Sequence, residues 1–240
     1  MERKLKDKAM KTKVITILAA AVILFFTASE LTAVEDKIFT SSGQILEGEE
    51  WSNVYIYNDD TIVDMLGGDV DGIGTYDAST VNVSGGHVNT IDALEYSTAN
   101  ISGGFVYGLH AKNNSIVNFS DGASGVSIGA GDFGKLNMYD GTTDLMGVID
   151  SGTINLYGGL ITESLGAWND SVVNIYGYDF NYDPMGGSLD GGQLTGFWLD
   201  STAFTIDLYG TETYSHINLI PEPSTLVLFA IGFFLIKRKT

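Results

Sequence analysis

Three groups of residues in this sequence have types and spacings that suit ligand chemistry. The first is a set of tyrosines that each lie two residues after an Asn or Asp in an apolar strand pattern, namely Tyr139, Tyr157, Tyr176 and Tyr209. Aromatic rings with a polar tip suit sugar rings and protein interfaces. Strand alternation predicts that these rings face solvent as a ladder, which makes them candidate glycan-binding residues. The alternative is that they stack on one another and only stiffen the sheet.

The second group is a pair of carboxylates in the glycine-rich segment 67–72. Asp69 and Asp71 are separated by one residue in Gly-Gly-Asp-Val-Asp-Gly. Calcium (Ca²⁺) prefers several oxygen ligands in a flexible loop. Because this segment lacks the complete ligand pattern of a calcium-binding loop, Asp69 and Asp71 are only a weak candidate metal site, and no other cofactor is expected. Diffuse cation binding by an acidic surface is the stronger expectation.

The third group is the small set of residues that could transfer a proton. Between residues 34 and 220 the side chains of this kind with basic character are Lys37, Lys112, Lys135, His87, His110 and His216. His110 and Lys112 are close in sequence, but the repeat pattern predicts no further acid or base beside them. The chain has no Cys and no nucleophile motif, so we expect no catalytic residues and a protein that is not an enzyme. The alternative is a polysaccharide lyase or hydrolase.

A short repeated strand must position all of these residues. Its central residue recurs at nearly constant intervals, at Asp64, Asn82, Asn100, Asn118, Asn137, Asn155 and Asn174. The residues on both sides of each centre are apolar, which is the alternation of a strand with one buried face. The apolar pair is therefore expected to point inward. The Asn side chains are expected to form a solvent-facing ladder in which amides hydrogen-bond from one repeat to the next.

The repeat predicts an all-β fold, a single-chain parallel β-helix with about 18–19 residues per turn. Glycines after each strand allow the chain to turn a corner. A left-handed helix built from hexapeptides would also have about 18 residues per turn, but the intervals that are one residue longer favour a right-handed coil. We expect an N-terminal cap at 34–60 that includes Trp51, Val54 and Ile56, and repeats at 61–220. An insertion is expected near 178–190, before a closing strand at 204–209 in which Asp207 takes the Asn position.

The two ends of the chain have the composition of targeting segments. Six of the twelve Lys and Arg lie between Met1 and Lys13, and an apolar run follows at 14–26. This order is typical of a secretory signal peptide, so residues 1–33 are expected to be a signal peptide that is cleaved on export near Ala28, Ser29 or Ala33. A hydrophobic helix is expected at 225–236, followed by Lys237, Arg238 and Lys239. These basic residues should stop transfer and stay on the cytoplasmic side.

The charge of the region between these ends excludes one class of partner. Residues 34–220 carry 26 acidic and 3 basic residues, a formal charge of −23. Such a surface repels nucleic acid and anionic lipid. We therefore expect no nucleic-acid partner.

The last twenty residues carry a specific resemblance. Pro221, Glu222 and Pro223 are followed by Ser224 and Thr225, then the hydrophobic run and the basic end. This segment, 221–240, resembles the PEP-CTERM sorting signal of Gram-negative bacteria that make exopolysaccharide. The repeats also look like the β-helical bodies found on such proteins, although more loosely.

The resemblance implies recognition by an exosortase, a membrane processing enzyme, and release or attachment at the cell surface. The expected function is therefore that of an exported, non-enzymatic component of the cell surface or extracellular matrix. The chain would be held briefly in the inner membrane and then serve a structural or adhesive role among exopolysaccharide or biofilm polymers.

Overall fold

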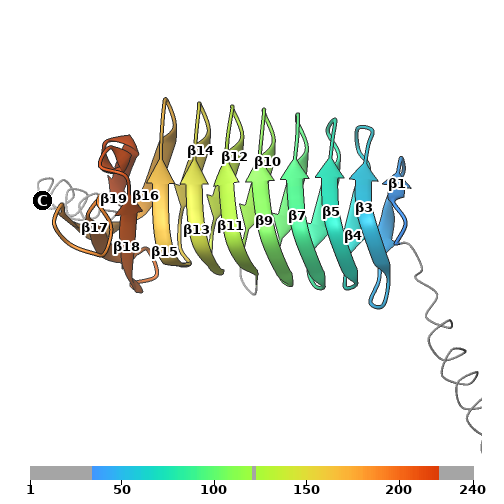
Figure 1. The fold of residues 1–240 in the computed structure, drawn as a ribbon, viewed down its shortest axis with the longest axis horizontal. Helices are drawn as coiled ribbons and strands as arrows, with labels where there is room; N and C mark the ends of the chain where they lie inside the picture. Colours follow the sequence, from blue (N-terminus) through green and yellow to red (C-terminus); the bar gives the residue numbers. More distant parts are fainter. Residues whose placement is uncertain (1–33, 121–122, 222–240) are drawn as a thin grey trace, which may run out of the picture. The chain divides into compact units, whose positions relative to one another are not determined.

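The computed structural model describes residues 34–120 and 123–221, and these residues form strands joined by short turns (Figure 1). Two sheets face each other. Sheet A contains β1 (Lys37–Phe39), β3 (Glu50–Ile56), β5 (Asp69–Thr75), β7 (His87–Ala93), β9 (Phe105–Ala111), β11 (Ser124–Ala130), β13 (Thr142–Val148) and β15 (Leu160–Ala167). Sheet B contains β2 (Gly43–Ile45), β4 (Ile62–Met65), β6 (Thr80–Val83), β8 (Thr98–Ile101), β10 (Ile116–Phe119), β12 (Lys135–Met138), β14 (Thr153–Leu156) and β16 (Val172–Asp183).

The strands of each sheet pair in parallel with those one turn away, so the chain is a β-helix. The register keeps equivalent residues together: Asn82 pairs with Asn100, and Asn137 with Asn155. In Figure 1 the strands of sheet A run upward in front while successive turns advance from right to left, which makes the coil right-handed. The prediction of an all-β, parallel β-helix is confirmed.

The core is the stack of apolar residues on either side of each Asn or Asp centre. From β4 to β16 every one of these side chains in sheet B is at most 1% exposed, including Val81, Val83, Ile154 and Leu156. Each fully buried aliphatic side chain contributes roughly 1.5–3 kcal/mol relative to leaving it in water. Because each turn buries its apolar face only against its neighbours, the stack is the cooperative unit.

Two kinds of corner join the strands. At the first, Gly86 has φ of +87°, and a Cβ there would lie 2.5 Å from the carbonyl oxygen of Gly68 in the preceding turn. Only glycine fits so close a contact. At the second corner, between sheets A and B, the left-handed conformation is taken by Asp77, Asn113, Asp132 and other polar residues. Asn and Asp tolerate this conformation better than other side chains, which explains why they recur there.

The β-helix begins earlier than the sequence indicates. β1 and β2 already form part of a turn, and β3 pairs in parallel with both β1 and β5. Val54 and Ile56 are therefore core residues of an ordinary turn, and the side chain that lies at the N-terminal end is Phe39, which is 9% exposed. Lys37 covers this end, with its Nζ 4.7 Å from the ring centroid of Trp51.

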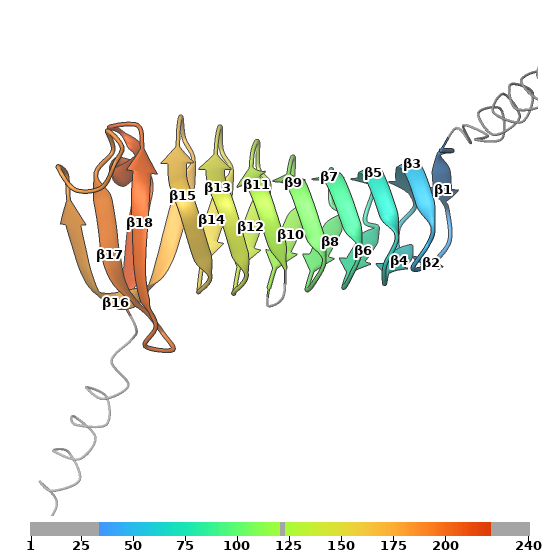
Figure 2. The same cartoon turned by 60° about the horizontal axis from the view of Figure 1, so that its bottom comes forward.

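The C-terminal end departs from the prediction. Residues 178–183 are not a loop, because β16 continues through Asp183 and pairs antiparallel with β17 (Gln193–Trp198). β17 then pairs antiparallel with β18 (Ala203–Tyr209), and β18 joins sheet A beside β15. Figure 2 shows the β17–β18 turn projecting from one edge of the fold. The interruption of the repeat is thus an antiparallel excursion rather than an inserted loop.

Asp207 consequently does not occupy the Asn position. Its carboxylate accepts hydrogen bonds from Gln193 Nε2 at 2.8 Å and from the backbone N–H of Ser188 at 3.0 Å. The Gln193 contact, followed by those from Ser188, holds the pKa of Asp207 below its usual value. The chain returns to sheet B only after the 3₁₀ helix η1 (Thr213–His216), in β19 (Ile217–Pro221), which pairs with β16.

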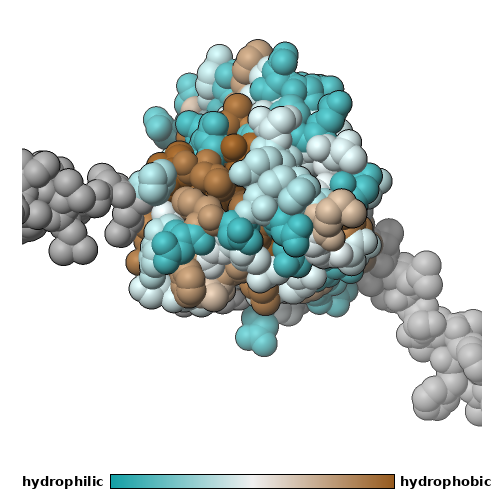
Figure 3. Space-filling model, turned by 90° about the vertical axis from the view of Figure 1, so that its left-hand side faces the viewer, coloured by the Kyte–Doolittle hydropathy of each residue, from teal (hydrophilic) through white to brown (hydrophobic). Residues whose placement is uncertain are grey.

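The end formed by these last elements carries apolar side chains among hydrophilic ones (Figure 3). Tyr182 stacks on Tyr214 with ring centroids 3.6 Å apart, and Tyr178 stacks on Phe197 at 5.5 Å. Met185 is 91% exposed in the turn between β16 and β17. Within the ranges given above, no helix is long and apolar enough to cross a membrane.

Candidate functional site

The Asn ladder connects the turns of sheet B by side-chain hydrogen bonds. Each amide nitrogen donates to the carbonyl or carboxylate oxygen of the equivalent residue one turn before, at 2.8–2.9 Å, in the series Asp64, Asn82, Asn100, Asn118, Asn137, Asn155 and Asn174. Asn218 of β19 extends the series, donating to Asn174 at 3.0 Å. Since both ends of each interior amide are engaged, these side chains stabilise the stack and offer little to a ligand.

Three of the four predicted tyrosines form a continuous stack. The ring centroids of Tyr139 and Tyr157 are 5.0 Å apart, and those of Tyr157 and Tyr176 are 4.3 Å apart, with nearly parallel planes. Burial, followed by a hydrogen bond with Tyr176, raises the pKa of Tyr157 to about 12. Because Tyr139 stacks on one side of the Tyr157 ring and Tyr176 on the other, both faces of this ring are covered. Tyr139, at the end of the stack and 50% exposed, keeps one face free of another tyrosine.

Tyr209 does not belong to this stack, which corrects the predicted column. It lies in β18, where the register places it beside Gly166 of β15, and its ring meets that of Trp168 edge to face at 6.0 Å. β18 pairs with β15 of sheet A, so the side chains that alternate outward along β18 lie on a different face of the β-helix from those of sheet B. Tyr209 is 53% exposed but is separated from the other three tyrosines.

Tyr139 and Tyr157 of the tyrosine stack form one wall of a groove. The opposite wall is the β17–β18 hairpin, and the space between them has a volume of about 660 Å³. The indole N–H of Trp198 donates to the carbonyl oxygen of Gly159 at 3.2 Å, which ties the hairpin to this corner of the β-helix. The groove is lined by the rings of Tyr139 and Tyr157, the apolar side chains of Leu199 and Ile161, and several polar groups of the hairpin and corners. Such a mixture of aromatic surface and a few polar groups is typical of small-ligand sites; we call this space the tyrosine groove.

A second assembly lies on sheet A, where Asp92 of β7 meets His110 and Lys112. Asp92 Oδ1 is 3.1 Å from His110 Nδ1 and 2.7 Å from Lys112 Nζ. The sequence analysis found no acid beside His110 and Lys112, yet Asp92 precedes His110 by one turn of the coil, and the two pair in register. The separation of 18 residues between Asp92 and His110, equal to one turn of the repeat, was the sequence signal that could have revealed this contact.

The pKa of Asp92 is lowered to about 2, first by the hydrogen bond with His110 and then by Lys112. A folded-state pKa below the usual 3.8 means that the ionised carboxylate stabilises the fold. This contribution is complete above about pH 4 and is lost as the pH falls through about 2. Because the Asp92 side chain is 35% exposed, solvent screening limits the contribution to about 1 kcal/mol.

Asp92→Asn should therefore lower the free energy of unfolding by about 1 kcal/mol near neutral pH and have almost no effect below about pH 2. Urea unfolding at the two pH values measures the difference. The control is Glu163→Gln, an exposed carboxylate of β15, which should change stability little at either pH. A loss of the same size at both pH values would contradict the role of the Asp92 charge.

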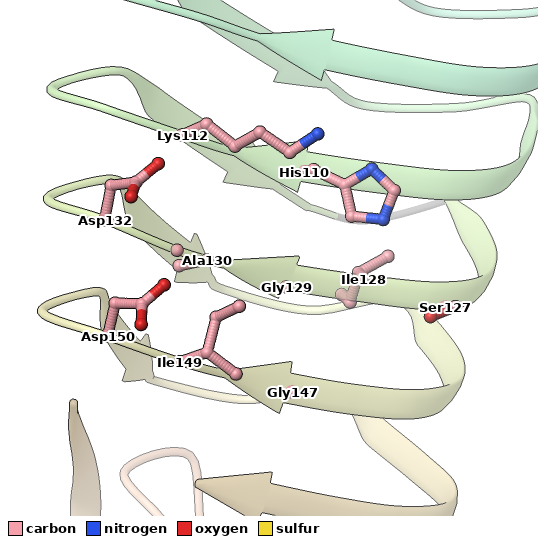
Figure 4. A pocket seen from close by; sticks show the side chains of 11 residues that line it. His110, Lys112, Ser127, Ile128, Gly129, Ala130, Asp132, Gly147, Ile149 and Asp150 are labelled. Atoms are coloured by element: carbon pink, nitrogen blue, oxygen red, sulfur yellow. The ribbon is translucent and has the colours of Figure 1, made fainter. Parts of the chain in front are cut away.

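A hollow of about 260 Å³ adjoins this assembly (Figure 4). His110 and Lys112 lie along one side, and Ile149 lies along the other. Asp132 and Asp150 approach from the turns that follow β11 and β13. We call this space the sheet A hollow.

The candidate calcium ligands are not gathered into a metal site. Asp69 Oδ1 lies 3.6 Å from Nδ1 of His87, and Asp71 Oδ1 accepts a hydrogen bond from Asn89 Nδ2 at 2.7 Å. Each carboxylate thus contacts the next turn of the coil. Among the side chains that the structure describes, no group of three or more His, Cys, Asp or Glu is arranged to hold a metal ion.

The chain matches no family model, no curated protein and no solved structure. The expected signal peptide at 1–33 lies outside the described residues. The same is true of Glu222, Pro223, Ser224 and Thr225 of the sorting motif, the hydrophobic segment and the basic end. Pro221 is the last described residue and ends β19.

Proposed function

We propose that this protein is an exported, non-enzymatic component of the cell surface or extracellular polymer matrix, with an adhesive role in which the tyrosine groove holds glycan. The observation that carries the glycan part of the proposal is the groove itself, about 660 Å³ between stacked tyrosines and a hairpin that offers both apolar and polar side chains. A β-helix places this groove on a stiff support, which reduces the entropy lost on binding.

The sorting part of the proposal rests on sequence. The basic and apolar start of the chain favours export, and the Pro221 to Thr240 segment resembles a PEP-CTERM signal. The partner would be an exosortase-type membrane enzyme. The inner membrane would hold the C-terminal segment before processing.

Only part of the tyrosine stack is suited to sugar. The faces of Tyr157 and Tyr176 that touch each other cannot also take a sugar ring, so a ligand would contact the free face of Tyr139 and the rim of Tyr157, the two tyrosines that line the groove. Asp140 and Asp200 stand at the border of the groove and provide acceptors for hydroxyl groups. A neutral sugar is favoured over an acidic one because these carboxylates would repel it.

Replacing Tyr139 with Ser should reduce affinity for cellohexaose, a neutral test glycan, at least fivefold, because aromatic contacts of this kind contribute about 1 kcal/mol. Serine is the residue at the equivalent position two turns earlier, Ser102, so the substitution suits the fold. Isothermal titration of the purified full-length chain measures the affinity.

Tyr107→Ser provides the matched control, since Tyr107 is 57% exposed and lies outside the tyrosine groove. It should bind as the unaltered protein does. If Tyr139→Ser and Tyr107→Ser both keep full affinity, or if the unaltered chain does not bind neutral glycans, the groove is not a glycan site.

A polysaccharide lyase or hydrolase is the second candidate, because Asp92 fixes the His110 ring beside Lys112 next to a hollow. An Asp that accepts from Nδ1 would leave Nε2 available as a base. Incubation with neutral, amine-bearing and uronate hexasaccharides separates the two functions: shortened products lost in His110→Ala would establish the enzyme, and intact glycans would support the binding protein.

A further inference from the structure

The sheet A hollow exists because side chains are missing from one row of the sheet. The register aligns His110 with Gly129 of β11 and Gly147 of β13. The imidazole therefore stands beside two turns that carry no side chain at the same position. Gly147 is partly exposed, whereas Gly129 is buried, so a ligand can approach the backbone at Gly147.

The borders of the hollow combine apolar and polar groups. Ile149 closes one side, and the ring of Trp168 lies beyond, where a Cβ on Gly147 would be 3.7 Å from it. His110 and Lys112 stand opposite, and the carboxylates of Asp132 and Asp150 approach from consecutive turns (Figure 4). At about 260 Å³ the space is smaller than pockets for drug-sized ligands, which start at about 300 Å³. It suits a single ring.

The charges in the hollow select against acidic ligands. Lys112 is paired with Asp92 at 2.7 Å, so its charge is largely compensated. Asp132 and Asp150 have no basic group within 4.0 Å among the residues that the structure describes, and both are exposed. Because Asp92 and Lys112 compensate each other, the carboxylates of Asp132 and Asp150 make the hollow negative. Asp150 also accepts a hydrogen bond from Asn169 Nδ2 at 3.1 Å, which leaves its charge in place. A carboxylate-bearing sugar would be repelled, and an ammonium group would be attracted.

We propose that the sheet A hollow binds one amine-bearing sugar ring, a hexosamine unit of a glycan. Its ammonium group lies between Asp132 and Asp150, its apolar face packs on Gly147 and Ile149, and a hydroxyl group reaches His110. The site lies on sheet A and shares no residue with the tyrosine groove. It would therefore add a preference for amino sugars to the proposed adhesive function, and it can be tested separately.

The first test fills the hollow. Gly147 has an ordinary φ, and its Cβ would make only van der Waals contact with Trp168, so Gly147→Val is expected to fold. Isothermal titration of the full-length chain with a glucosamine hexamer should show at least a tenfold loss of affinity in Gly147→Val. The melting temperature should stay within a few degrees of the unaltered protein. Tyr139→Ser should retain full affinity for this ligand.

The second test examines the charge. Asp132→Asn with Asp150→Asn keeps the left-handed turn conformation, which Asn also tolerates. This double variant should lose the preference for the glucosamine hexamer over its N-acetylated form. Glu163→Gln, at an exposed residue that does not line the hollow, should keep that preference.

Three results would overturn the proposal: a folded Gly147→Val chain that binds the glucosamine hexamer normally, a galacturonate hexamer that binds as tightly as the glucosamine hexamer, or no measurable binding of the glucosamine hexamer. The two sites are separated by their variants. If Tyr139→Ser loses neutral glycan while Gly147→Val changes nothing, the tyrosine groove stands and the sheet A hollow does not. The reverse pattern supports the hollow alone.

Discussion

Replacing Ile154 with Asp should destabilise the β-helix by about 4 kcal/mol or more, the largest effect expected from any single substitution considered for this chain. Ile154 is fully buried in β14, between Leu136 and Val173 of the adjacent turns. The substitution removes an aliphatic side chain from the core and places a carboxyl group where no partner can reach it. Urea unfolding followed by circular dichroism should show either a strongly reduced midpoint or no folded protein.

Ile116→Asp is the matched control for this substitution. Ile116 begins the equivalent strand β10 one residue before the buried pair, and its side chain is 37% exposed. The same chemical change at this position should cost less than about 1 kcal/mol, as is usual for surface substitutions. Equal losses from Ile154→Asp and Ile116→Asp would show that the assignment of inward and outward faces is wrong.

Asn155→Ser tests the neighbouring position on the opposite face. The sequence pattern predicts a mild effect, because it places this residue in solvent. In the structure Asn155 is only 8% exposed, donates to Asn137 and accepts from Asn174. Shortening the side chain leaves these two neighbours without a partner, so a loss of about 1–3 kcal/mol is expected, intermediate between the two isoleucine variants.

The body of the fold was predictable because the chain repeats one local pattern. Each repeat contains a three-residue strand motif, in which two apolar residues flank a polar one, followed by a corner that usually contains glycine. This motif recurs at a nearly constant interval of about 18–19 residues, which admits few structures other than a stack of parallel turns. Once the stack is accepted, alternation alone assigns Ile154 inward and Asn155 outward. The amide contacts of the ladder follow from the parallel register, since identical residues lie one above another.

The C-terminal excursion was not predictable from the same pattern. The sequence Phe-Thr-Ile-Asp-Leu-Tyr at 204–209 has the alternation of a strand, but alternation does not specify which strand it will pair with. Asp207 and Tyr209 therefore matched the repeat locally and were placed in sheet B, whereas β18 pairs with β15 in sheet A. The tyrosine groove depends on this excursion, and so it could not be derived from spacing.

In the two candidate sites as well, the sequence predicted some features and could not predict others. The sequence analysis singled out Tyr139 and Tyr157 and left open whether their rings face solvent or stack on one another, and only the ring-to-ring distances show that neighbouring tyrosines cover each other. Likewise it singled out His110 and Lys112 but not Asp92, which meets them through the register of β7 and β9. Residue types are visible in sequence, whereas contacts between turns need the register and the side-chain conformations.

Pro221→Ala with Pro223→Ala should leave the C-terminal segment uncleaved in the membrane fraction, whereas the unaltered chain should lose it. The reasoning is that a processing enzyme must recognise an extended backbone, and proline restricts its own φ and disfavours helix in the residue before it. Alanine removes both restraints, and the hydrophobic helix expected at 225–236 would then extend backward toward the motif. Intact mass of the protein recovered from the membrane and from the medium measures the outcome, because removal of the tail changes the mass by a defined amount.

Pro184→Ala is the matched control, since Pro184 is the one proline of the chain outside the motif and lies exposed in the turn after β16. It should be processed like the unaltered protein, which would show that the effect belongs to the motif and not to a loss of proline in general. If the unaltered chain and the double variant both keep the tail, the segment acts as a plain membrane anchor, and the proposed release into the matrix loses its main support. If both lose the tail, the cleavage does not read the two prolines, and the resemblance to the PEP-CTERM signal does not extend to its recognition.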